Sequence, residues 1–241
     1  MDDVSSLVGE LDNALRAEGD AVRAAGARAY LKIDLEFLGV AAKPLRDVAR
    51  SFLLRHSDLN RNRLLELVNR LWEQPVFEFK AVAVAVLERR VGELQPGDLE
   101  LVESLLRRSH TWALVDWLCT KVAAPLVECD PERAQSLLRR WSADDDFWVR
   151  RASMLAQLPA LRSGGGDFEL FADFASRMLD EREFFIRKAI GWVLRDVSKK
   201  RPQLVFEFLD RHIDKVSGVT FREGSKYLPE EQAQALRRRR D

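Results

Sequence analysis

The chain has 241 residues and is 46% hydrophobic, which is enough for one globular domain or one short repeat array with a sizeable core. Its 39 Lys and Arg residues equal its 39 Asp and Glu residues, so net charge indicates no nucleic-acid partner, and such an indication must come from where the charges lie. The two cysteines and three histidines show no metal-ligand spacing, so we expect no metal site and no cofactor.

The beginning of the chain, MDDVSSLVGE, is acidic and lacks a long apolar run, which argues against a signal peptide. No segment has the length and apolarity of a transmembrane helix. We therefore expect a soluble, monomeric protein that does not associate with membranes and resides in the cytoplasm.

The pattern along the chain predicts helices alone. Apolar residues recur at the helical period, and the alternating β-branched runs of strands are missing. We predict an all-α protein forming a single repeat domain over residues 1–241, with residues 237–241 as a disordered basic tail and the glycine run 163–166 as a flexible connector. Proline and glycine place helices over residues 4–17, 20–33, 44–56, 60–72, 75–91, 98–108, 111–124, 131–141, 146–159, 167–179, 182–200, 202–213, 219–226 and 229–239.

An internal repeat is visible in these helices. The sequence FWVRRA, residues 147–152, matches FFIRKA, residues 184–189, position by position, and weaker copies begin at Val76 and near Trp112. Repeats of this length, each with two helices, are typical of HEAT-like arrays, in which neighbouring pairs bury a core that one pair cannot bury alone. We expect the helices that begin near residues 75, 111, 146 and 182 to form a concave inner layer. Chance similarity between amphipathic helices is the alternative.

The helix predicted near residue 111 carries an indole and a carboxylate outside its core stripe. Leu114, Val115 and Leu118 lie on the stripe, whereas Trp112 and Asp116 project about opposite to it and are neighbours one turn apart. Such a pair suits a ligand. The alternative is that the indole fills a gap between repeats and the carboxylate is merely solvated.

A cation interrupts the apolar stripe of the next repeat. Arg151 lies among Phe147, Trp148 and Leu155, and a guanidinium there needs an acceptor or an anion, because an unpaired buried charge costs several kcal/mol. A bridge to a carboxylate of an adjoining helix and a contact with a phosphate are both consistent with this position. Arg150, on the outer face of the same helix, is expected to be solvated.

The helix predicted over residues 182–200 carries a third unusual face. Its core stripe is apolar, but Trp192 lies on the opposite, basic face with Lys188, Arg195 and Lys199. An indole among cations suits a flat or anionic ligand, although packing between two helix layers is the alternative.

Together these residues suit a polyanion that carries a cationic centre. Cations would follow phosphates, indole faces would attract positive charge, and a carboxylate would stabilise positive charge that develops during a reaction. No Ser-His-Asp or Cys-His set and no glycosidase-like pair of carboxylates is present, which disfavours acyl transfer and ordinary glycoside hydrolysis.

Several blocks also resemble a known family. TWALVD, FWVRRASML, EFFIRKAIGWVLRDVSKK, YLKIDLEFLGV, LWEQPVFEFKA and SGVTFREGSKYL resemble, in order and spacing, the HEAT-like DNA alkylation repair glycosylases of the AlkD type. The resemblance covers nearly the whole chain. It implies a right-handed solenoid of HEAT-like repeats with a concave basic cleft for duplex DNA.

The resemblance also implies an activity and roles for residues. The family hydrolyses the N-glycosidic bond of positively charged N7-alkylguanine and N3-alkyladenine in duplex DNA, without flipping the base into a pocket. Carried over by motif, Asp116 resembles the catalytic carboxylate, and Trp112 and Trp192 resemble the aromatic walls against the lesion. Arg151 resembles a DNA-backbone clamp, and Tyr30 a further DNA-contacting position.

Two other classes of protein stay open. A non-catalytic HEAT-like binder of DNA structures would use the basic residues to hold phosphates and leave Asp116 inert. A protein-interaction solenoid is compatible with the neutral net charge.

Overall fold

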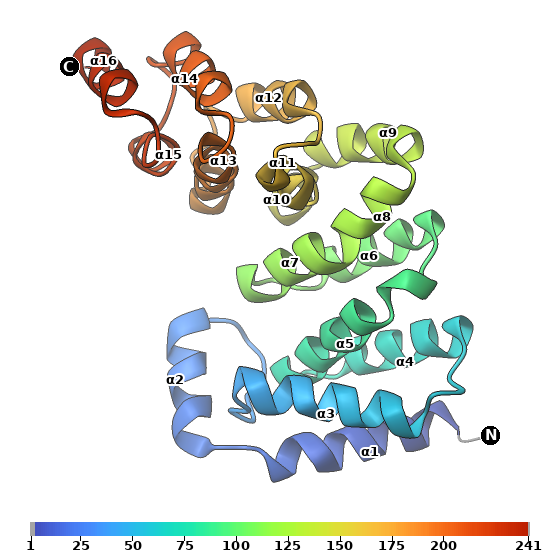
Figure 1. The fold of residues 1–241 in the computed structure, drawn as a ribbon. Coiled ribbons are helices and arrows are strands. Elements are labelled where there is room, and N and C mark those ends of the chain that lie inside the picture. Colours follow the sequence, from blue (N-terminus) through green and yellow to red (C-terminus); the bar gives the residue numbers. More distant parts are fainter. Residues whose placement is uncertain (1–2, 241) are drawn as a thin grey trace. The chain divides into compact units, whose positions relative to one another are not determined.

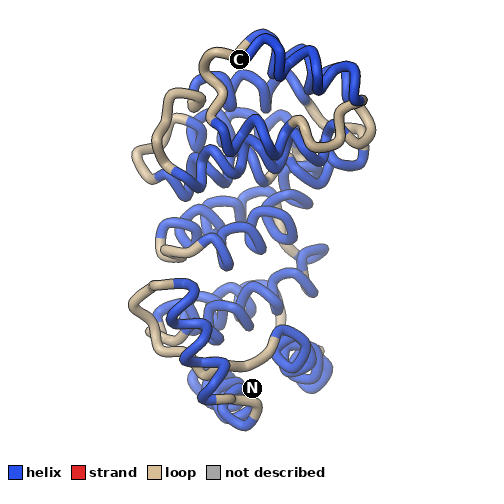
Figure 2. Tube along the Cα trace, turned by 90° about the vertical axis from the view of Figure 1, so that its left-hand side faces the viewer, coloured by secondary structure: helices blue, strands red, loops and turns tan. Residues whose placement is uncertain are grey.

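The computed structural model describes residues 3–240, and its regular elements in that range are helices, with one isolated bridge between Glu36 and Val76 (Figures 1 and 2). The predicted all-α class is therefore confirmed. The chain divides into two compact units that join between Val122 and Ala123. Each unit is described by itself, and the expected single repeat domain stays a prediction.

The first unit is built from helices that pack in pairs (Figure 1). Helix α1 packs on α4, α4 on α5, α3 on α5, α5 on α7 and α6 on α7. The apolar face of each helix is buried, and Phe52, Leu64 and Trp72 are at most 1% exposed. The helices are α1 Val4–Ala17, α2 Ala21–Leu31, α3 Ala42–Arg55, α4 Arg61–Glu73, α5 Phe77–Arg89, α6 Leu99–Arg107 and α7 Trp112–Leu118.

Helix α2 differs from the others because none of its residues is buried. The segment that follows it, residues 32–41, is tied to the beginning of α5. The buried carboxylate of Glu78 accepts hydrogen bonds from the backbone N–H groups of Leu38, Gly39 and Val40 at 2.9, 2.8 and 3.3 Å. The ring of Phe37 also stacks on that of Phe77 with centroids 5.2 Å apart. One buried carboxylate thus fixes the loop that carries α2.

The second unit continues with further helix pairs (Figure 1). Helix α9 packs on α10, α10 on α13, and α13 on α14 and α15. Helices α10 and α13 each begin with a copy of the sequence repeat, and aromatic residues of the two copies are in contact. The ring centroids of Trp148 and Phe185 lie 4.8 Å apart. The helices are α8 Ala124–Cys129, α9 Pro131–Ser142, α10 Phe147–Leu155, α11 Leu158–Ser163, α12 Phe168–Arg177, α13 Phe184–Ser198, α14 Pro202–Arg211, α15 Gly218–Gly224 and α16 Glu230–Arg240.

Two prolines explain where the helices depart from the predicted bounds. The helix expected over residues 146–159 is two helices, because the ring of Pro159 cannot be accommodated in a helix that continues from Leu155. The helix expected to end at residue 124 continues into α8. It does so through a π-helical turn, Cys119–Ala123, that precedes Pro125, which has no N–H to donate.

The glycine run and the end of the chain are more ordered than expected. Gly164 and Gly166 take positive φ angles of 94° and 66°, and Arg201 donates to the carbonyl of Gly165 at 2.7 Å, so the predicted flexible connector is a defined turn. Residues 237–240 of the expected disordered tail lie in α16, where Arg239 bonds to Asp210; residue 241 lies outside the described residues. Over residues 3–240, the structure contains no helix with both the length and the apolarity needed to span a membrane.

The Glu78 carboxylate yields a stability prediction. Replacing Glu78 by Ala leaves three backbone N–H groups of residues 38–40 without their acceptor, and unsatisfied buried donors cost about 1–3 kcal/mol. We expect Glu78→Ala to lower the free energy of unfolding by at least about 2 kcal/mol in urea denaturation. Glu73→Ala, which removes a carboxylate from an exposed ion pair with Arg70, is the matched control and should have little effect. Equal losses in the two variants would contradict this assignment.

Candidate functional site

Helix α7 positions the first pair of predicted site residues. The Thr111 hydroxyl accepts a hydrogen bond from the N–H of Ala113 at 3.3 Å and so caps the helix. The core stripe is buried as predicted, with Leu114 at 0% exposure. Burial of that stripe leaves Trp112 and Asp116 on the other side of the helix, each only partly buried. An indole and a carboxylate are therefore accessible one helical turn apart.

Tyr30 joins this pair. Its ring meets that of Trp112 edge to face, with centroids 6.0 Å apart, and the side chain is 73% exposed. The two residues come from α2 and α7, and the Glu78-bound loop fixes the position of α2. The structure thus brings together Tyr30 and Trp112, two residues that the family resemblance singled out separately.

The backbone around Asp116 is irregular on both sides. His110, just before the cap of α7, has a φ angle of 51°, in the left-handed region that non-glycine residues rarely adopt. The π-helical turn Cys119–Ala123 directly follows the end of α7, three residues after Asp116. The Thr120 hydroxyl in this turn donates to the Asp116 carbonyl at 2.7 Å. Single π-helical turns occur frequently at functional sites.

Helix α13 positions the second indole. Ile186, Ile190 and Val193 are fully buried, as the periodicity predicts, and Trp192 is half-buried on another face. The indole Nε1 donates to Oδ2 of Asp196 at 3.2 Å, one helical turn further along. The hydrogen bond fixes the direction of the ring's N–H edge.

Two carboxylates hold the cations that surround Trp192. Asp196 is 2% exposed and accepts from Arg162 at 2.8 Å and from Lys199 at 2.8 Å. Glu223, on α15, accepts from Lys188 at 2.5 Å and also from Arg195. The predicted basic face therefore exists, but its cations are paired within the protein. Their role in DNA binding stays a prediction.

The pKa values of both carboxyls reflect these contacts. Burial alone raises the pKa of Asp196, but the hydrogen bonds from Lys199 and Arg162 outweigh it and hold the pKa below its usual value of 3.8. The hydrogen bond from Lys188 lowers the pKa of Glu223 more than its partial burial raises it, and the charge of Arg195 adds to the lowering. Both groups are ionised at neutral pH.

The two arginines of α10 differ in environment. Arg151 is 2% exposed, donates to the carbonyl of Phe185 and lies over that ring at 5.9 Å, so a backbone carbonyl is one acceptor of the predicted buried guanidinium. Its predicted contact with DNA stays a prediction. Arg150, expected from the helical pattern to be solvated, instead bonds to Glu181 at 2.8 and 2.9 Å.

The sequence analysis did not identify three residues that lie on or beside α7 and α13: Asp196, Glu223 and Trp117. Asp196 follows Trp192 at the spacing by which Asp116 follows Trp112, so the repeated Trp-x-x-x-Asp pattern was a readable signal. Glu223 had no such signal, because its partners lie on another helix. Trp117 bonds through Nε1 to Glu88 at 2.8 Å, and the guanidinium of Arg46 lies 5.1 Å from its ring.

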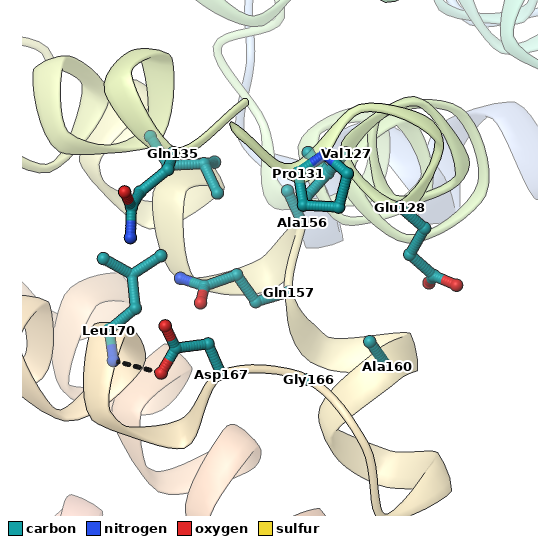
Figure 3. Close-up of a pocket in the computed structure, with 11 residues that line it drawn as sticks. Val127, Glu128, Pro131, Gln135, Ala156, Gln157, Ala160, Gly166, Asp167 and Leu170 are labelled. Atoms are coloured by element: carbon teal, nitrogen blue, oxygen red, sulfur yellow. Dashed lines mark hydrogen bonds between the residues drawn. The ribbon is translucent and has the colours of Figure 1, made fainter. Parts of the chain in front are cut away.

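The second unit also contains a cavity of about 190 Å³ that none of the predicted site residues lines (Figure 3). Its wall is mainly apolar, with Leu138, Ala156 and Leu170, and Gln157 and Asp167 contribute polar atoms. Within residues 3–240, no group of three or more His, Cys, Asp or Glu side chains could hold a metal ion.

The predicted site residues thus form two groups. Tyr30, Trp112 and Asp116 belong to the first unit. Arg151, Trp192 and the cations Lys188, Arg195 and Lys199 belong to the second. Trp112 and Trp192 are each partly buried, and their contact with a ligand stays a prediction. A site that combines the two groups stays a prediction.

Comparison with protein families gives one match. A family model described as DNA alkylation repair enzyme matches residues 11–228, which is most of the chain. Among curated proteins, no sequence matches.

Solved structures give several matches. A predicted DNA alkylation repair enzyme from Enterococcus faecalis has a TM-score of 0.80 and 24% identity, over 88% of this chain and 98% of its own. AlkD2 from Streptococcus mutans has a TM-score of 0.57 and 14% identity, over 85% and 97%. The alkylpurine DNA glycosylase AlkC of Pseudomonas fluorescens, bound to DNA containing an abasic site analog, has a TM-score of 0.56 and 17% identity, over 97% and 65%. At these identities the likeness shows the fold, an all-α arrangement of helical repeats.

The lowered pKa of Asp196 predicts how its contribution to stability depends on pH. A carboxyl whose folded-state pKa is lowered stabilises the fold above its usual pKa of 3.8, and this stabilisation is lost as the pH falls through the folded-state value. We expect Asp196→Asn to lower the free energy of unfolding at about pH 7, and the difference from wild type to shrink below about pH 4. Urea denaturation across this range measures it. A difference that stayed constant to about pH 3 would contradict the ion pairing.

Proposed function

The chain belongs to the DNA alkylation repair enzyme family, and we propose that it is a DNA glycosylase that hydrolyses the N-glycosidic bond of positively charged alkylated purines in duplex DNA. Its substrates in this proposal are N7-alkylguanine and N3-alkyladenine. The protein acts in base excision repair, needs no metal or nucleotide cofactor, and works as a monomer in the cytoplasm, associated with the nucleoid when it acts on DNA.

One observation carries the proposal. Trp112 and Asp116 are both partly exposed on the face of α7 that lies away from its buried stripe, and Tyr30 packs edge to face against the indole. An aromatic surface attracts a cationic ring through its quadrupole. A carboxylate one helical turn away is suited to stabilising positive charge on an adjacent sugar.

The chemistry of the lesion explains why one carboxylate suffices. Alkylation at N7 or N3 makes the purine positively charged, so the base leaves as a neutral molecule and needs no proton from a general acid. As the C1′–N bond breaks, positive charge develops on the deoxyribose. The Asp116 carboxylate stabilises this charge and orients the water that attacks C1′. The oxygen of this water becomes the C1′ hydroxyl of the abasic product, and the proton that it loses passes by way of the carboxylate to solvent.

The second unit supports the same proposal with a second indole. Trp192 is partly buried, and Lys188, Arg195 and Lys199 lie near it in sequence on the predicted basic face, where Glu223 and Asp196 accept hydrogen bonds from them. In the proposed complex the cations lie near DNA phosphates and the indole contacts the lesion nucleotide. AlkC, which has a similar fold, is bound in its solved structure to DNA containing an abasic site analog, and this supports DNA as the partner.

The base stays unflipped in this proposal. Most glycosylases that act on a base move it into an enclosed pocket. Here Trp112 and Asp116 lie on a helix surface, and the cavity of the second unit is lined by neither indole. This arrangement supports hydrolysis of the bond with the nucleotide near the duplex.

The first test is removal of the Asp116 charge. We expect Asp116→Asn to lower the rate of 7-methylguanine release from methylated duplex DNA at least about a hundredfold, because charge stabilisation is lost, and to change DNA affinity little. The matched control is Asp180→Asn, which alters an exposed aspartate whose carboxylate lies 3.5 Å from Lys215. Release by wild type but not by Asp116→Asn separates the enzyme from a non-catalytic DNA binder. Unchanged release by Asp116→Asn would exclude the catalytic role.

A second test addresses DNA binding itself. Binding that neutralises about six phosphates should weaken by roughly a thousandfold between about 50 and 200 mM salt, because counterions are released. Fluorescence anisotropy with a labelled duplex measures this dependence. A salt-independent response would remove the DNA hypotheses and favour a protein-interaction role.

A further inference from the structure

The two indoles of the proposed site are each followed four residues later by an aspartate, yet the two aspartates differ in environment. Asp116 is partly exposed, whereas Asp196 is 2% exposed and accepts hydrogen bonds from Trp192, Arg162 and Lys199. A carboxylate so enclosed by donors inside the protein is not available to a substrate. It can act only through the groups that it holds.

We propose that Asp196 is a positioning residue that sets the ring plane of Trp192 for contact with the cationic purine. This inference rests on the proposed function of the protein. Asp196 itself touches neither the base nor the sugar, and its effect on excision is transmitted through the indole.

The geometry explains how one carboxylate fixes the ring. The indole N–H is donated to Oδ2 at 3.2 Å, and Arg162 anchors the same oxygen from α11 with contacts of 2.8 and 2.6 Å. Lys199 holds the other oxygen, Oδ1, at 2.8 Å. Because both oxygens are held, the carboxylate cannot rotate freely, and the ring edge that bonds to it is fixed as well.

Orientation matters because the attraction between a cation and an aromatic ring acts over the face of the ring, not along its edge. A half-buried indole without a partner for its N–H can take other rotamers. A small misplacement of a group that positions the substrate can lower the rate by up to about a hundredfold.

Two substitutions of Asp196 separate positioning from simple ion pairing. Asp196→Ala and Asp196→Asn both remove the charge that Arg162 and Lys199 neutralise, but only the asparagine keeps an oxygen that can accept the indole N–H. We expect Asp196→Ala to lower the excision rate roughly tenfold to a hundredfold and Asp196→Asn to retain most of it. If the aspartate served only as an ion-pair partner, the two variants would lose activity equally.

A double-mutant cycle with Trp192→Phe tests whether Asp196 acts through the indole. Phenylalanine keeps an aromatic face but has no N–H, so Asp196→Ala should have little further effect on excision in that background. Glu223→Ala is the matched control, because this carboxylate also holds two cations of α13 but does not bond to the indole. Its effect should combine with that of Trp192→Phe additively. Additive losses for Asp196→Ala and Trp192→Phe would overturn the proposal.

An NMR measurement keeps the inference independent of activity. The indole N–H resonance of Trp192, assigned by its loss in Trp192→Phe, should shift and exchange faster with water in Asp196→Ala but not in Glu223→Ala. An unchanged resonance in Asp196→Ala would overturn the positioning role. If wild type released no base, the proposed function would fail and the functional part of this inference with it, whereas the resonance would still report whether Asp196 orients Trp192.

Discussion

Each helix that carries a site residue has one apolar stripe to bury, and this requirement determines what remains accessible. In α7 the buried stripe contains Leu114 and Leu118, so Trp112 is left only partly buried. In α13 the same packing of Ile186 and Ile190 leaves Trp192 half-buried. An indole is usually more useful to stability inside a core. Neither Trp112 nor Trp192 is fully buried, which is compatible with the ligand contact that we propose.

Helical periodicity was enough to predict the class, the helix order and the buried stripes of α7 and α13, because these depend only on residues within one helix. It could not predict partners on other helices. Arg150 was expected to be solvated, yet it meets Glu181 of the following repeat, and the cations of α13 meet Glu223 of α15. The contact between Tyr30 and Trp112 likewise depends on a loop that Glu78 holds, which no periodicity reveals.

The same Trp-x-x-x-Asp spacing occurs in two environments in this protein. On α7 the aspartate stays partly exposed, and on α13 it is enclosed by Arg162, Lys199 and the indole. In the function that we propose, environment and not residue type separates two roles, as it does for pairs of carboxylates in other enzymes. One aspartate would face the charge that develops on the sugar, and the other would fix an aromatic surface.

The central claim is that Trp112 and Trp192 contact a cationic purine in DNA. Its most direct measurement is a titration of the ¹⁵N-labelled protein with a duplex containing N7-methylguanine on a 2′-fluorinated sugar, in which the electron-withdrawing fluorine slows cleavage. The account predicts that the indole resonances of Trp112 and Trp192 shift more than with the unmodified duplex, while those of Trp72 and Trp141, at most 1% exposed, change little. Equal shifts with both duplexes, or shifts confined to other tryptophans, would contradict it.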